Sequence, residues 1–160
     1  MRLNVRRLVT SLVCAGFVAL LVGVASAQTD PQVGAWKLDV AKSKYSPGPA
    51  PTSGSTTIEV VGEGVKVVVD QVFADGPRHW SFTANYDGKD SPVTGNPEMD
   101  TVARTRVNAR TVKTVAKKGG KVMTTQTSAV SSDGKTRTVT TTGVNSKGEK
   151  VHNVAVYTKQ

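Results

Sequence analysis

Cysteine is all but absent from this sequence, since its single copy, Cys14, lies in an apolar stretch near the start. No cysteine follows Ala27, which excludes a disulfide framework, a thiolate metal site and a cysteine nucleophile. The two histidines, His79 and His152, lie on separate predicted strands without a zinc-binding spacing. We therefore predict no metal site and no cofactor, and a fold that depends on its hydrophobic core alone.

Catalytic signatures are also lacking. The sequence has no Gly-x-Ser-x-Gly elbow, no glycine-rich phosphate loop before a helix, and no aromatic platform interleaved with basic residues. Its closely spaced carboxylates, Asp87 with Asp90 and Glu98 with Asp100, fall in predicted turns, where local hydrogen bonding accounts for them. We predict that the protein is not an enzyme, has no catalytic residues and does not bind nucleic acid.

The stretch Met1–Ala27 has the three parts of a secretory signal peptide. An arginine-containing start is followed by an apolar run over residues 8–24 and by Ala25-Ser26-Ala27, a pattern that signal peptidase cleaves. A retained membrane anchor is the alternative, because the apolar run approaches the length that spans a bilayer. We expect cleavage, no stable membrane insertion afterwards, and a protein exported to the periplasm or the extracellular space.

Negative charge is scarce, with 12 Asp and Glu against 21 Lys and Arg. Without the three arginines of the predicted signal peptide, 18 basic residues still face 12 acidic ones. In an exported protein such an excess favours contact with an anionic envelope surface. The basic residues are scattered, which is typical of a solvated outer face, and we expect this for Lys37, Lys66, Arg104, Lys121, Arg137 and Lys150.

Long helical patterns are missing, and short Val- and Thr-rich segments follow one another, separated by Asp-Gly and Gly-Gly turns. We predict one domain over residues 28–160, an all-β antiparallel up-and-down barrel of about 8–10 strands, and a monomer. A two-sheet sandwich is the alternative. The expected strands cover residues 33–38, 56–61, 65–73, 78–86, 90–94, 101–107, 111–117, 121–130, 136–144 and 151–159, with a helical turn at 39–45 and a proline-rich crossing at 46–54.

Gly34 and Trp36 open this series of strands. Trp36 is large enough to plug one end of a barrel, and Gly34 lets a neighbouring backbone pass close by. In the segment 78–86 the alternation places Trp80, Phe82 and Tyr86 on one face, which is a core or a ligand wall.

The run Gly34-Ala35-Trp36-Lys37-Leu38 and the ending Val156-Tyr157-Thr158-Lys159 resemble the calycin superfamily of lipocalins and fatty-acid-binding proteins. The longer run 36–49, with 86–89 and 92–97, is similar to small exported bacterial proteins described as lipocalin-like and of unknown function. The resemblance implies that Trp36 closes the barrel base. It also implies an Arg-x-Tyr carboxylate clamp on the last strand, of which this sequence keeps Tyr157 but has Ala155 in place of the arginine.

Two functions of different class follow from these observations. The first is a barrel that binds a small apolar or amphipathic molecule, with Arg104, Arg106 or Arg137 as a charged anchor if one of them points inward. Its predicted ligand-binding residues are Trp80, Phe82, Tyr86, Arg106 and Tyr157. The second is a ligand-free barrel that acts as an envelope structural or interaction protein and has a packed interior. The placement of Arg106, inside or outside the barrel, distinguishes the two, because a buried arginine without an anionic partner would be too costly to keep.

Overall fold

The computed structural model describes residues 29–160, so the predicted signal peptide, Met1–Ala27, lies outside the described residues. Within this part of the chain, no helix is long and apolar enough to cross a membrane. The described residues form ten strands, which are β1 (Gly34–Lys44), β2 (Ser53–Val61), β3 (Gly64–Phe73), β4 (Gly76–Ala84), β5 (Asp87–Thr94), β6 (Thr101–Asn108), β7 (Thr111–Lys118), β8 (Lys121–Val130), β9 (Thr136–Val144) and β10 (Lys150–Lys159).

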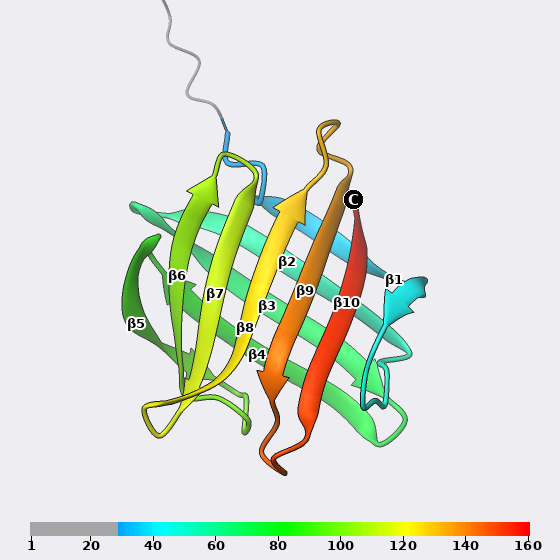
Figure 1. Cartoon of the computed structure of the whole chain (residues 1–160). Helices are drawn as coiled ribbons and strands as arrows, with labels where there is room; N and C mark the ends of the chain where they lie inside the picture. Colours follow the sequence, from blue (N-terminus) through cyan, green and yellow to red (C-terminus); the bar gives the residue numbers. More distant parts are fainter. Residues whose placement is uncertain (1–28) are drawn as a thin grey trace, which may run out of the picture.

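The strands close into a single barrel. Each strand pairs antiparallel with the next, and β1 pairs with β10, so no sheet edge is left open (Figure 1). The predicted fold class, an antiparallel up-and-down barrel, is confirmed, and the sandwich alternative is wrong. The shortest seam joins β4 to β5 through the register pairs Ser81 with Thr94 and Phe82 with Val93.

The predicted helical turn at residues 39–45 is wrong, because β1 continues to Lys44. The capping interaction that suggested a helix does exist, since Asp39 Oδ1 accepts a hydrogen bond from the Lys42 amide at 3.2 Å. It forms inside an irregularity where the β1–β10 register shifts. There Ser43 Oγ accepts a hydrogen bond from the Val156 amide at 3.0 Å, so the pairing with β10 overrides the local helical preference.

One end of the barrel is sealed by Trp36 and the segment before β1. Trp36 is fully buried, and its Nε1 donates to the Gln32 carbonyl at 2.9 Å. Gly34 adopts φ +133°, which strains any side chain. The buried cluster at this end and below it consists of Trp36, Leu38, Ile58, Val65, Val67, Val69, Val130, Val139, Ala155 and Tyr157.

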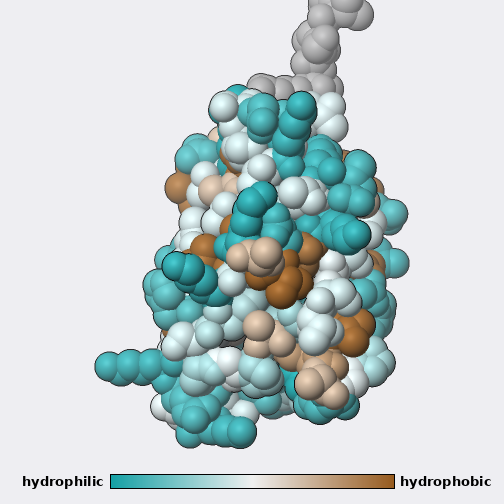
Figure 2. Space-filling view, turned by 90° about the vertical axis from the view of Figure 1, so that its right-hand side faces the viewer, coloured by the Kyte–Doolittle hydropathy of each residue, from teal (hydrophilic) through white to brown (hydrophobic). Residues whose placement is uncertain are grey.

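The scattered basic residues divide into two groups. Lys37, Lys66, Lys121 and Lys150 are exposed, as expected of a solvated outer face, and Figure 2 shows hydrophilic residues spread over one side of the barrel around an apolar centre. The same expectation is wrong for Arg104 and Arg137, which are only 3% and 8% exposed. Two positive charges therefore lie inside the barrel.

Candidate ligand-binding site

A cavity of about 560 Å³ occupies the interior of the barrel. This volume is within the range of small-molecule sites in proteins. Its mouth lies at the end opposite Trp36, because the lining includes residues of the connections at that end: Gly48, Pro49, Asp75, Asn96, Glu98, Ser146 and Lys147. The barrel is thus hollow, closed at the base and open at the other end.

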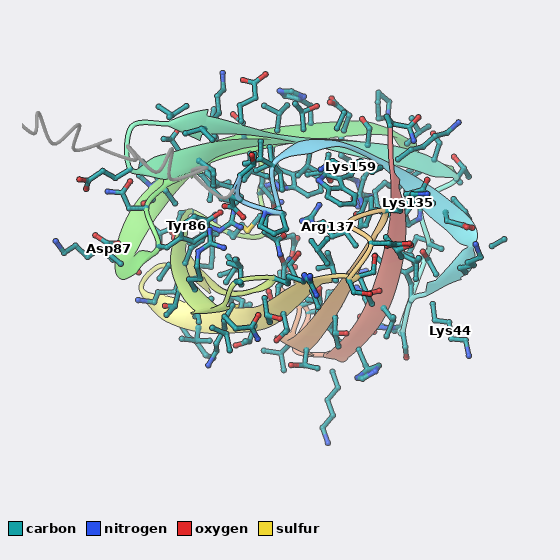
Figure 3. The ribbon with its side chains drawn as sticks, turned by 90° about the horizontal axis from the view of Figure 1, so that it is seen from above. Lys44, Tyr86, Asp87, Lys135, Arg137 and Lys159 are labelled. Carbon is teal, nitrogen blue, oxygen red and sulfur yellow. The ribbon has the colours of Figure 1, made fainter. Side chains whose placement is uncertain are left out.

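Arg104 on β6 and Arg137 on β9 line this cavity. Figure 3, which looks down the barrel, shows Arg137 within the ring of strands. Neither arginine forms a salt bridge with a carboxylate of residues 29–160. Arg104 Nε and Arg137 NH1 are buried and have no hydrogen-bond partner among these residues. The cavity therefore holds two cations with donor groups left to bind.

Aromatic rings partly compensate for the missing anions. The Arg137 guanidinium carbon lies 5.3 Å from the centroid of the Tyr157 ring, and Arg104 lies 5.2 Å from that of Tyr86 and 5.7 Å from that of Phe82. Burial lowers the pKa of Arg137 to about 10 and also lowers the pKa of Arg104. At pH 7 both groups remain charged, so burial without a carboxylate has a free-energy cost that an anionic ligand would offset.

A chain of hydrogen bonds connects Arg137 to the segment that seals the closed end of the barrel. Arg137 Nε donates to Ser128 Oγ at 2.9 Å, and Ser128 Oγ donates to Gln32 Oε1 at 2.8 Å. Gln32 is fully buried, and its Nε2 donates to the carbonyls of Arg110 and Ser128 at 2.9 Å and 3.1 Å. The segment before β1 thus fixes both the barrel base and the orientation of a cavity-lining guanidinium.

Arg106 has a different environment from Arg104, although both point inward from β6. Its guanidinium donates to both carboxylate oxygens of Asp30 and lies 3.9 Å from the centroid of the Tyr86 ring. Tyr86 also donates from its hydroxyl to Asp30 Oδ2 at 2.6 Å. Arg106 is therefore a paired cation that ties the segment before β1 to the barrel wall. Its placement, expected to distinguish a ligand-binding barrel from a filled one, does not do so, because Asp30 supplies its anion.

The pKa of Asp30 is lowered by this arrangement. Partial burial acts to raise the pKa, but the hydrogen bonds from Arg106, Tyr86 and the Gln32 amide outweigh it. A folded-state pKa below the unfolded value gives stability that is present above about pH 4 and is lost as the pH falls further, through the folded-state pKa.

We expect Asp30→Asn to lower the free energy of unfolding at pH 7 by about 2 kcal/mol, because Arg106 loses its anion. Urea denaturation at pH 7 and near pH 2.5 measures this, and the difference from the native protein should shrink at the lower pH as Asp30 is protonated. Asp39→Asn, at an exposed pair with Lys42, is the matched control and should change little. A deficit of equal size at both pH values would contradict the role of the Asp30 charge.

The predicted ligand-binding residues divide between the cavity and the closed end. Trp80, Phe82 and Tyr157 line the cavity, whereas Tyr86 and Arg106 contact Asp30 and are not part of the lining. The sequence left the choice among three arginines open. The structure brings Arg137, rather than Arg106, next to Tyr157, its direct register partner on the adjacent strand.

The histidines do not meet. His79 lies on the outer face of β4, with Nδ1 2.7 Å from Asp70 Oδ1, and His152 is exposed on β10. Among residues 29–160, no group of three or more His, Cys, Asp or Glu side chains is arranged to hold a metal ion.

Comparison with known proteins identifies no sequence relative: no protein-family profile matches the chain, and no curated protein matches it significantly. Among solved structures, the chain is similar to one described as "The Siderocalin Ex-FABP functions through dual ligand specificities". The two share 14% sequence identity, the alignment covers 81% of this chain and 74% of the other, and the TM-score is 0.39.

Proposed function

We propose that this protein is an exported carrier or sensor that binds a small amphipathic molecule with an acidic group inside its barrel. The observation that carries the proposal is the pair of buried guanidinium groups, Arg104 and Arg137, which line a hollow interior and have no carboxylate partner among residues 29–160. A filled barrel would leave these charges without compensation. The proposal is therefore a binding function, in preference to a ligand-free envelope module.

The apolar part of the ligand has its own contacts. Val67, Val69, Trp80 and Phe82, on β3 and β4, line the same cavity. Burying hydrocarbon against these side chains yields roughly 25 cal/mol per Å² of apolar surface removed from water. The apolar wall supplies most of the affinity in this arrangement, and the arginines select for the acid.

Dodecanoate and dodecanol test the proposal, because they share a hydrocarbon chain and differ in charge. We expect the native protein to bind dodecanoate about thirtyfold more tightly, since hydrogen bonds to a charged group contribute about 1.5–3 kcal/mol. Quenching or enhancement of tryptophan fluorescence measures both affinities, because Trp80 lines the cavity. Equal affinities would show that the arginines do not select an acid.

Native mass spectrometry of the protein purified from an exporting host gives a second readout. A reproducible adduct that is acidic on solvent extraction supports the proposal. A bare mass, together with no binding of either probe, would overturn the carrier function and favour an envelope partner.

A further inference from the structure

The interior of the barrel is more polar on one side than on the other. Figure 1 shows β6–β10 on one side of the barrel and β2–β4 on the other. The cavity-lining side chains of β3 and β4 are mostly apolar or aromatic, with two polar exceptions, Gln71 and Arg78. The apolar and aromatic ones are Val67, Val69, Phe73, Trp80 and Phe82. Besides Arg137, the cavity-lining side chains of β7, β8 and β9 are mixed: the polar ones are Thr114, Thr124, Gln126, Ser128 and Thr141, and the apolar ones are Ala116, Met123, Val139 and Val144. We call the side that carries these five polar side chains the polar wall.

An ordinary hydrocarbon chain cannot form hydrogen bonds with the side chains of the polar wall. Ser128 is already bonded to Gln32 and Arg137. A hydroxyl or amide group that lines the cavity without such a bond needs water or a polar ligand atom as its partner, because burial without a hydrogen bond is unfavourable. The Tyr45 hydroxyl, which also lines the cavity, is buried without a partner among residues 29–160. A flexible alkyl chain that displaced the water would leave such groups unpaired.

We propose, building on the function proposed above, that the ligand is facially amphipathic: a rigid acid with hydroxyl groups along one face and hydrocarbon on the other. Its hydroxyl face lies against Thr124, Gln126 and Thr141, and its hydrocarbon face against Trp80 and Phe82. The acidic group extends toward Arg104 and Arg137. A rigid ligand also keeps its two faces in register with the two walls at a small cost in conformational entropy.

Cholate and cholanic acid are suitable probes, because they share a rigid skeleton and a carboxyl group and only cholate has hydroxyl groups, all on one face. We expect the native protein to bind cholate about tenfold more tightly, which corresponds to one or two net hydrogen bonds. A uniformly apolar cavity would give the opposite order, since cholanic acid has less polar surface to dehydrate. Titration below the critical micelle concentration, followed by tryptophan fluorescence, measures both affinities.

Gln126→Leu tests the polar wall directly. We expect the variant to lose about fivefold of the preference for cholate while it binds cholanic acid at least as well as the native protein. Thr127→Val is the matched control, because Thr127 is the next residue along β8 and is exposed on the outer face. It should leave both affinities unchanged.

The outcomes separate the two proposals. A native protein that prefers cholanic acid, or a preference for cholate that Gln126→Leu leaves intact, would overturn the facial arrangement, whereas dodecanoate selectivity would still support the binding of an acid. If neither dodecanoate nor either steroid acid binds, both proposals are overturned.

Discussion

Replacing Arg137 with methionine is expected to remove most of the selectivity for acids and, at the same time, to stabilise the protein. Methionine fills a similar volume without a charge. It removes a buried cation whose desolvation costs several kcal/mol, against the loss of one hydrogen bond to Ser128 and a cation–π contact with Tyr157, about 2–3 kcal/mol together. We expect a net increase of about 1–2 kcal/mol in the free energy of unfolding.

The binding readout for Arg137→Met is the ratio of dodecanoate to dodecanol affinity. We expect this ratio to fall about tenfold or more, because one of the two guanidinium groups that attract the acid is gone. Urea denaturation of the ligand-free protein gives the stability. Lower stability together with unchanged dodecanoate affinity would assign Arg137 a purely structural role.

Arg106→Met is the matched control, because it removes an arginine that also points inward but is paired. Asp30 would lose its cation while its carboxylate stays partly buried, so we expect stability to fall by about 2 kcal/mol. Dodecanoate affinity should fall much less than in Arg137→Met, because Arg106 does not line the cavity and acts on Arg137 only through the segment before β1. Opposite signs of the stability change for two Arg→Met substitutions would distinguish an anchor for a ligand from a structural ion pair.

Much of the barrel follows from local patterns in the sequence. The Val- and Thr-rich segments predict the strands, and the alternation that places Trp80 and Phe82 on one face predicts the side of β4 that lines the cavity. The pairing of Arg137 with Tyr157 could also be predicted from the sequence. The two residues are equally far along the chain from Lys147, in the turn between β9 and β10. Counting outward from that turn pairs them, so register in a hairpin is a guide to which residues meet.

No local pattern in the sequence shows which of Arg104 and Arg106 lines the cavity without a carboxylate partner. Both occupy inward positions of β6, and alternation cannot separate residues two apart. The difference arises from Asp30, which is more than seventy positions away from both and reaches Arg106 only because the segment before β1 folds against the barrel base. A contact of that range depends on tertiary structure, and so does the irregularity in β1, where pairing with β10 overrides a helix-like cap.

Trp36→Ala is expected to be the most destabilising single substitution, at about 4 kcal/mol. The indole is fully buried at the closed end, so its removal leaves a cavity that the strands around it cannot fill. The substitution also leaves the Gln32 carbonyl without its donor, at 2.9 Å in the native protein.

Trp36→Phe separates the two contributions, because it keeps an aromatic ring and removes the N–H. We expect it to cost about 2 kcal/mol, and Trp80→Ala, at a half-buried position on the cavity wall, to cost less than Trp36→Ala while weakening ligand binding. Urea denaturation of the three variants measures the series.

Since Gln32 bonds to Ser128, which holds Arg137, Trp36→Phe should also reduce dodecanoate selectivity. Unchanged selectivity in a destabilised Trp36→Phe would show that the barrel base and the anchor arginine are independent.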